Sequence, residues 1–291
     1  MAEGAAAAET TITTAAGIAA RLDRVPATRG LWRLVAILSL GGAFEYYDIF
    51  LTGYVVPGMT RAGLFTPESL GPLTLLGTVG ARGVGTFVFM TFAGMFVGAL
   101  AFGAAADRFG RRAVFTWSML AYSAATLMMA LQATGFAVDL WRFLAGIGIG
   151  VELVTIDTYV AELMPPEVRG RAFALNQVVS FLAVPLVALL AWLLVPVAPF
   201  GLDGWRWVVL IGAAGALGVW VIRRRVPESP RWLVRQGRLA EADVVTQRFE
   251  AAAIRETGAP CCRRRASPSL SRRALVDSPR SGRPLTQDAS G

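Results

Sequence analysis

The stretch AGMFVGALAFGAAADRFGRR, residues 93–112, combines the two patterns that decide the fold. Its first part is apolar and rich in glycine and alanine, and its second part is a turn with an aspartate and three arginines. Similar apolar blocks recur along the chain, and each is long enough to cross a bilayer about 30 Å thick. Charged residues make up only 16% of the chain, compared with about 25% in soluble domains. The sequence therefore predicts an integral membrane protein.

Each apolar block is expected to form one transmembrane helix, because a transmembrane barrel would instead show short strands of alternating polarity. The predicted fold class is an all-α membrane protein with six transmembrane helices. Glycine and alanine within the blocks are expected to let the helices approach closely. The expected spans are residues 33–57, 84–106, 113–131, 138–160, 172–198 and 205–222.

Arginines are concentrated in alternate loops. They gather before the first span and after the second, fourth and sixth, whereas the opposite loops hold only Arg61, Arg82 and Arg206. By the positive-inside rule, both termini are expected to be cytoplasmic, and the expected location is the plasma (inner) membrane. The net charge of +8 is interpreted in the same way, as a topology signal beside a lipid bilayer, so we expect no nucleic-acid partner.

Residues of the usual catalytic kinds are scarce. The chain has no histidine, and its only two cysteines, Cys261 and Cys262, are adjacent and lie outside the expected spans. Histidine is the commonest general base and a common metal ligand, and two adjacent cysteines do not make a disulfide framework. We therefore expect neither an enzyme nor a metal site.

The composition divides the chain into four segments. We expect a cytoplasmic N-terminal segment at residues 1–32, a transmembrane bundle at 33–222 and a cytoplasmic linker helix at 223–256. Residues 257–291 are rich in Arg, Ser and Pro and cannot form a core, so they are expected to be disordered. Because this change occurs within the linker of a chain that lacks lysine, we expect a truncated or frame-shifted product.

Three motifs resemble signatures of the major facilitator superfamily, in its sugar-porter and organic (aromatic) acid:proton symporter branches. GAAADRFGRR, residues 103–112, is similar to the loop between spans two and three of that family. RFLAGIGIGVELVTIDTYVAELMPPEVRG, residues 142–170, resembles its span-four signature, except that Asp157 stands where sugar porters usually have proline. PESPRWL, residues 227–233, resembles the signature after span six. The resemblance implies one bundle of two inverted three-helix repeats, the N-terminal half of a twelve-span fold.

In this family the loop between spans two and three latches the two halves in one conformation. A buried Asp107 could pair with an arginine or a helix N-terminus, and Gly110 would permit a tight turn. Glu162 and Arg169 are expected to join the loop in a cytoplasmic charge network. The predicted latch residues are Gly103, Asp107, Arg108, Gly110, Arg111, Arg112, Glu162 and Arg169.

Two carboxylates, Glu45 and Asp48, lie one helical turn apart inside the first span. A charged side chain at the centre of a membrane helix costs roughly 2.5–3.5 kcal/mol on insertion scales. In sugar porters, an acidic residue of span one and an arginine of span four are proton-coupling partners, and here Asp48 and Arg142 stand at those positions. The resemblance implies that Asp48 accepts a proton when Arg142 moves away. A static ion pair for Asp48, and a substrate-orienting or packing role for Glu45, remain alternatives.

The predicted substrate-binding residues lie in spans four and five. Gln177 stands where sugar porters place a substrate-binding glutamine, and Asn176 is its neighbour. Glu152 is expected either to line the cavity or to pair within the bundle. Gln177 favours a sugar or polyol, whereas Glu45, Asp48 and Asp157 favour an organic acid.

The resemblance implies proton-coupled symport of a small polar metabolite, with the proton as the coupling ion and no cofactor. The expected partners are the bilayer, the substrate, and a second six-helix half or a second copy that completes the cavity. One bundle alone is expected to be inactive. The alternative is a membrane sensor or assembly partner that binds a ligand without moving it.

Overall fold

The computed structural model describes residues 14–102, 105–224 and 226–258, which lie within one compact unit, residues 1–261. All regular structure in the described ranges is helical. The predicted disordered tail falls almost entirely outside these ranges, as does the start of the predicted N-terminal segment.

Six helical spans in the described residues are long and apolar enough to cross a membrane, which confirms the predicted fold class. The spans agree with the expected ones to within several residues at each end. They are α3 (Arg29–Tyr54), α6 (Val84–Phe102), α8 (Arg111–Ala130), α9 (Gly135–Leu163), α10 (Pro166–Phe181) continued by α11 (Ala183–Leu194), and α12 (Gly204–Arg223).

The fifth span is divided at Leu182, between α10 and α11. Pro185 lies in the first turn of α11 and has no backbone N–H to donate to the carbonyl of Phe181. The missing helical hydrogen bond is the physical reason for the break.

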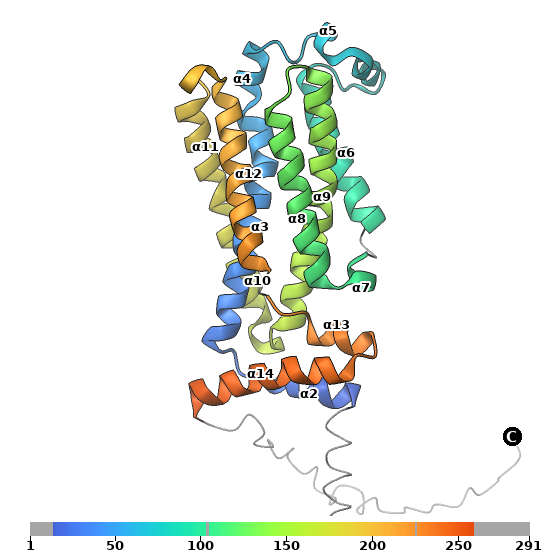
Figure 1. The fold of residues 1–291 in the computed structure, drawn as a ribbon, viewed down its shortest axis with the longest axis vertical. Coiled ribbons are helices and arrows are strands. Elements are labelled where there is room, and N and C mark those ends of the chain that lie inside the picture. The colour runs from blue at the N-terminus through green and yellow to red at the C-terminus, as the bar shows by residue number, and fades with distance from the viewer. Residues whose placement is uncertain (1–13, 103–104, 225, 259–291) are drawn as a thin grey trace, which may run out of the picture. The chain divides into compact units, whose positions relative to one another are not determined.

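The spans form two three-helix units, and the first helix of each unit packs mainly against the other unit (Figure 1). α9 packs mainly on α6 and α8, whereas α3 packs mainly on α10, α11 and α12. The first helix of each unit thus contacts the second and third helices of the other unit. Because each unit contains an odd number of spans, the second unit begins at the opposite end of the bundle from the first. This arrangement is the one expected for two inverted repeats.

The interface between α6 and α9 is made by glycines on both helices. A Cβ atom on Gly98 would lie 2.1 Å from the carbonyl oxygen of Ile147, and one on Gly150 would lie 2.1 Å from that of Met95. Gly94 and Gly146 meet opposing backbone in the same way. Each helix therefore presents a small-xxx-small pattern to the other, as predicted for close helix packing.

Shorter helices lie at the two ends of the bundle. α2 (Ala15–Arg24), α13 (Pro230–Arg235) and α14 (Leu239–Thr257) gather at the end where α3 begins, which we call the α14 end (Figure 1). Arg21 of α2 bonds Asp243 at 2.5 Å and Glu250 at 2.6 Å on α14. The opposite end, called the α5 end, holds α4 (Val56–Arg61), α5 (Pro67–Leu70), η1 (Gly71–Val79) and η2 (Pro199–Gly201).

Candidate functional site

A buried ion pair joins the first and fourth spans. Nη1 of Arg142 lies 2.7 Å from Oδ1 of Asp48, and the two side chains are 0% and 5% exposed. The sequence predicted these two residues as partners, and the structure brings them together. Asp48 belongs to the C-terminal part of α3 and Arg142 to the N-terminal part of α9, so the pair lies toward the α5 end.

The hydrogen bonds of this pair are nearly complete. Arg142 donates to the carbonyl oxygen of Asp48 and to Oγ1 of Thr52, both at 2.6 Å, and to Oγ1 of Thr91 at 3.0 Å. Thr126 donates to Oδ2 of Asp48 at 2.8 Å. A buried charge is tolerated when it is paired and its remaining donors and acceptors are satisfied. The sequence did not reveal the three threonines, which come from three different helices.

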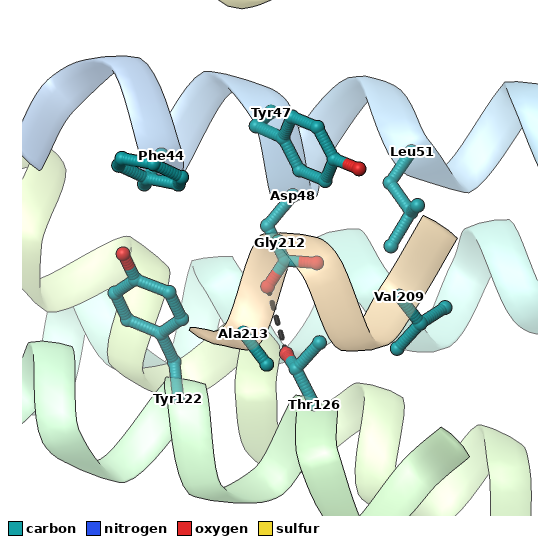
Figure 2. Close-up of a pocket in the computed structure, with 9 residues that line it drawn as sticks. All are labelled: Phe44, Tyr47, Asp48, Leu51, Tyr122, Thr126, Val209, Gly212 and Ala213. Carbon is teal, nitrogen blue, oxygen red and sulfur yellow. Dashed lines mark hydrogen bonds between the residues drawn. The ribbon is translucent and has the colours of Figure 1, made fainter. Parts of the chain in front are cut away.

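A small cavity borders Asp48 on the side of α8 and α12 (Figure 2). Figure 2 shows the Asp48 carboxylate between the Thr126 hydroxyl and the space beneath Phe44 and Tyr47. Tyr122 also lines this cavity, and its buried hydroxyl has no hydrogen-bond partner in the described part of the chain. The lining of the cavity therefore includes a polar hydroxyl on the Phe44 side, in addition to Asp48 and Thr126.

A second buried ion pair, Glu152–Arg223, lies nearer the α14 end. Nη1 of Arg223 contacts Oε1 of Glu152, and both side chains are 0% exposed. Nη2 of Arg223 donates to the carbonyl oxygen of Leu38 at 2.8 Å, and the guanidinium lies 5.0 Å from the ring centre of Phe115. Of the two alternatives for Glu152, the structure shows the pairing within the bundle, and its predicted role in substrate binding stays a prediction.

Arg223 corrects one interpretation of the sequence. The expected sixth span ends at residue 222, which leaves Arg223 among the loop arginines, but Arg223 is the last residue of α12 and is buried. It continues the buried stripe of Gly212, Ala216 and Val219 at helical spacing. That spacing was the signal that could have identified Arg223 as an interior residue.

Glu45 is buried without a cationic partner of its own. It is 1% exposed, and its Oε1 has no hydrogen-bond partner in the described residues. It lies within electrostatic range of Glu152, Asp157 and Arg223. Glu45 therefore belongs with the second ion pair, although it is one turn from Asp48.

The predicted substrate residues Asn176 and Gln177 line one small pocket with Glu45, Asp157 and Ser180. Nδ2 of Asn176 donates to Oδ1 of Asp157 at 3.4 Å. Three buried oxygens in this pocket have no hydrogen-bond partner in the described part of the chain: Oε1 of Glu45, Oδ1 of Asn176 and Oγ of Ser180. Gln177 is exposed. The pocket is rich in acceptors, and two of its residues are acidic.

At the α14 end, the predicted latch residues meet the segment after α12. α7 (Ala105–Phe109) presents Asp107, whose Oδ1 lies 2.7 Å from Nη2 of Arg111. The same nitrogen of Arg111 lies 3.2 Å from Oε1 of Glu162, and Arg235 of α13 contacts this carboxylate as well. Trp232 donates to the carbonyl oxygen of Asp107 at 2.8 Å. The loop, the end of α9 and α13 thus form one charged cluster.

Two expectations for this cluster need correction. The Asp107 side chain is 67% exposed rather than buried, and it contacts the buried Arg111 from the surface. Arg169 donates to the carbonyl oxygen of Met164 at 3.3 Å, while Arg111 and Arg235 hold Glu162. Arg108 is exposed beside the ring of Phe109, and Gly103 lies outside the described residues.

The turn at Gly110 is held by a half-buried glutamate. Gly110 has φ 100°, and a Cβ atom there would lie 2.5 Å from Oε2 of Glu228. Oε1 of Glu228 accepts from the backbone N–H groups of Arg112 at 3.1 Å and Ser229 at 3.0 Å. Burial raises the pKa of Glu228, and these backbone donors oppose part of that increase. Glu228 was missed as a site residue, although it lies in the quoted PESPRWL motif.

In the described ranges, no group of three or more His, Cys, Asp or Glu side chains is arranged to hold a metal ion. The chemistry that these residues support is proton binding and charge pairing inside an apolar bundle.

Residues 34–258 match the family model described as "Sugar (and other) transporter". The niacin transporter NiaP of Acinetobacter baylyi is 30% identical over 243 residues, which are 84% of this chain and 50% of that protein. The putative metabolite transport protein YyaJ of Bacillus subtilis is 30% identical over 239 residues, which are 82% of this chain and 49% of that protein. The chain thus spans about half the length of the curated relatives it matches.

Solved structures confirm the fold. The xylose transporter XylE from E. coli, in a partially occluded inward-open conformation, superposes with a TM-score of 0.63 at 21% identity, covering 78% of this chain and 60% of that chain. The relatives are transporters rather than enzymes, as the sequence predicted. On its helical fold and its match over residues 34–258, this chain is a multi-pass membrane protein that belongs to the sugar (and other) transporter family, with the fold of the major facilitator structures.

Proposed function

We propose that this six-helix unit forms half of a proton-coupled symporter for a small polar metabolite. The observation that carries the proposal is the buried Asp48–Arg142 pair, which joins the first and fourth spans. A charge pair inside a membrane bundle is costly to maintain, and such residues usually mark ion or substrate pathways. Proton coupling is also named for a fold neighbour described as a proton:xylose symporter.

In the proposed mechanism, Asp48 exchanges a proton as the bundle changes conformation. While Arg142 is close, Asp48 is charged and the two helices are held together. When the helices move apart, the unpaired carboxylate would remain in an apolar interior, so it takes a proton. Protonation of Asp48 and movement of α3 relative to α9 are thereby linked.

The proposed substrate site is the pocket lined by Glu45, Asn176 and Gln177. The unpartnered acceptor oxygens of this pocket support it, because a sugar, a polyol or a protonated acid could donate hydrogen bonds to them. NiaP is named as a niacin transporter, and the XylE structures are named for xylose. A sugar or an organic acid therefore remains the proposed substrate class, with Glu152 as a further member of the site.

The α14 end is proposed to face the cytoplasm of a plasma (inner) membrane. Arg111, Arg112, Arg169 and Arg224 lie at or near this end, which suits the positive-inside rule. The charged cluster around Asp107 and Glu162 is proposed as a conformational latch, with the arginines of the loop as its reversible partners.

A second six-helix unit is proposed to complete the transport cavity. The curated relatives are about twice as long as the matched region, and alternating access in such folds needs one bundle to move against another. The second unit could be another copy of this chain or a separate six-helix half. A single bundle is expected to be inactive in transport.

Reconstitution tests the proposal directly. The purified chain is placed in proteoliposomes, and uptake of radiolabelled nicotinate and xylose is measured with and without an inward proton gradient. Native mass spectrometry of the same sample gives the number of copies. Uptake that depends on the gradient and is lost in Asp48→Asn would support the proposal.

The control is Asp203→Asn, which changes an exposed aspartate at the α5 end and should leave uptake unchanged. Binding of either compound without flux in an assembly of two bundles would instead favour a sensor. Uptake that survives in Asp48→Asn and ignores the gradient would reject proton coupling.

A further inference from the structure

Asp139 is a buried carboxylate within a membrane span, and the proposed transport cycle does not use it. It lies in the second turn of α9, one turn before Arg142, and its side chain is 0% exposed. Neither Oδ1 nor Oδ2 has a hydrogen-bond partner in the described part of the chain. An ionised carboxylate in this position would be an unpaired charge in an apolar interior, which is among the costliest arrangements in a protein.

Thr86 of α6 lies next to Asp139 and indicates how a proton on the Asp139 carboxyl group would be hydrogen-bonded. Thr86 lies beside the carboxylate, but its single hydroxyl hydrogen is donated to the carbonyl oxygen of Gly83 at 2.7 Å. A threonine hydroxyl has one donor hydrogen and two acceptor lone pairs. With its hydroxyl hydrogen on Gly83, Thr86 offers Asp139 an acceptor. A protonated Asp139 could donate to this oxygen, whereas an ionised one would face another lone pair.

Few other charges face Asp139 from the helices packed on α9. α6 carries no charged residue within Val84–Phe102. At the α5 end, Glu68 of α5 and Arg82 before α6 are exposed to solvent. The charged residues of α8, α10 and α13 lie toward the opposite end of α9, and α3 contributes Asp48 and Glu45. The buried cation near Asp139 is therefore Arg142.

Arg142 and Asp139 are placed to meet. Residues three apart on a helix share one face, with Cβ atoms about 5–6 Å apart. Side chains on a helix also lean toward its N-terminus, so Arg142 extends toward the turn that holds Asp139. In the present structure Arg142 is engaged by Asp48 instead.

We propose that Asp139 is a second proton-binding residue that shares Arg142 with Asp48. One proton is distributed over the two carboxylates, and Arg142 pairs with whichever is ionised. The present structure is the state with Asp48 ionised and Asp139 protonated. In the exchange, the O–H bond at Asp139 breaks, water carries the proton, and an O–H bond forms at Asp48. The arginine, one carboxylate and one carboxylic acid sum to zero charge before and after. The inference rests on the proposed proton coupling at Asp48.

Infrared spectroscopy tests this inference without requiring transport. The full chain, with aspartate side-chain carboxyl groups labelled with ¹³C, is reconstituted in lipid bilayers at neutral pH. The label separates aspartic acid C=O bands from those of glutamic acid side chains. We expect a protonated-aspartate band in the unsubstituted chain that is lost in Asp139→Asn. Asp203→Asn, which changes an exposed aspartate, should leave the band in place.

Asp48→Asn provides the decisive second variant. Without the Asp48 carboxylate, Arg142 should turn to Asp139, which then ionises, so the band should be lost although Asp139 is still present. Absence of the band in the unsubstituted chain, or its persistence in either Asp139→Asn or Asp48→Asn, would overturn the proposal. If Asp139→Asn does not fold, the unsubstituted chain and Asp48→Asn still decide between the outcomes. If the infrared bands behave as expected but the reconstituted chain shows no proton-dependent uptake, the proposed function is rejected. The sharing of one proton between Asp48 and Asp139 is then retained.

Discussion

Each of the two buried ion pairs joins one carboxylate to one arginine, but the pairs differ in how completely they are hydrogen-bonded. Arg142 donates to four acceptors on α3 and α6, and both carboxylate oxygens of Asp48 accept a hydrogen bond. In the Glu152–Arg223 pair, Oε2 of Glu152 and Nε of Arg223 have no hydrogen-bond partner among the described residues. Glu45 lies nearby with an unpartnered oxygen of its own.

This difference separates a pair with one fixed carboxylate on α3 from a pair beside which α3 supplies a further carboxylate, Glu45. Asp48 has a fixed set of donors, so no other described carboxylate on α3 can replace it without losing the bonds to Thr126 and Arg142. Arg223, in contrast, has two carboxylates within electrostatic range, of which one is bonded to it. The first arrangement specifies how α3, α8 and α9 pack. The second tolerates the exchange of one acid for another.

Arg142→Met should have the largest effect on stability. The substitution keeps the volume of the apolar stem but leaves Asp48 buried without its cation. Removing one partner of a buried pair typically costs about 3–5 kcal/mol. The loss would be measured as a lower free energy of unfolding in detergent micelles, followed by tryptophan fluorescence.

The double variant Asp48→Asn/Arg142→Met is the control for this result. It removes both charges, and replacing a buried pair with uncharged groups is often close to neutral. We therefore expect it to recover most of the lost stability. A double variant as unstable as Arg142→Met alone would show that the threonine contacts, rather than the buried charge, dominate.

Glu152→Gln should cost less, because Glu45 can take over as the carboxylate for Arg223. We expect a loss of about 1–2 kcal/mol, the difference between a charge-assisted and a neutral hydrogen bond. Glu45→Gln alone should change the stability little. The double variant should lose more than the sum of the single ones, with a coupling of about 0.5–3 kcal/mol, as is usual for residues in one network. Additive losses in the same unfolding measurement would contradict the idea of redundancy.

Gly41→Ala should disturb the Glu152–Arg223 pair, but not the Asp48–Arg142 pair, without removing a charge. A Cβ atom on Gly41 would lie 1.5 Å from Nη2 of Arg223, so the guanidinium would have to move away from Glu152. Forcing extra volume into a packed interior costs typically about 1–3 kcal/mol. The matched control is Gly53→Ala on the same helix near the other pair, where a Cβ atom meets nothing within 4 Å.

Gly53→Ala should be neutral or slightly stabilising, because alanine is the better helix former. The measurement is the same unfolding assay. Equal effects of the two substitutions would mean that Arg223 is not held in place over Gly41.

The sequence predicted the fold and the Asp48–Arg142 pair because both depend on local patterns. Apolar blocks of membrane length identify the spans, and the resemblance of residues 142–170 to the span-four signature of sugar porters implied that Arg142 is the partner of Asp48. The threonines that complete this pair were not predictable, because they come from different helices and depend on helix rotation. Thr52, Thr91 and Thr126 have no distinguishing sequence context.

The partner of Glu152 was missed for a different reason. Arg223 stands next to two other arginines, and a cluster of that kind is usually a topology signal. Its interior position follows only from the buried stripe through Gly212 and Ala216. Asp139 was missed because a lone aspartate near the start of a span is normally taken to lie at the membrane surface.

Glu228 is a carboxylate outside the spans that can be compared with these pairs. Its substitution should have the smallest effect on stability. Burial raises its pKa in the folded chain, so the folded state holds the proton to higher pH than the unfolded state does. The stabilising contribution is therefore present below the unfolded pKa and is lost as pH rises through the folded pKa.

Glu228→Gln cannot titrate and keeps an acceptor oxygen for the N–H groups of Arg112 and Ser229. Thermal unfolding followed by tryptophan fluorescence, between acidic and neutral pH, should show a steeper loss of stability with rising pH in the unsubstituted chain than in Glu228→Gln. Parallel pH profiles would mean that the backbone donors of Arg112 and Ser229 already balance the cost of burying the Glu228 carboxylate beside Gly110.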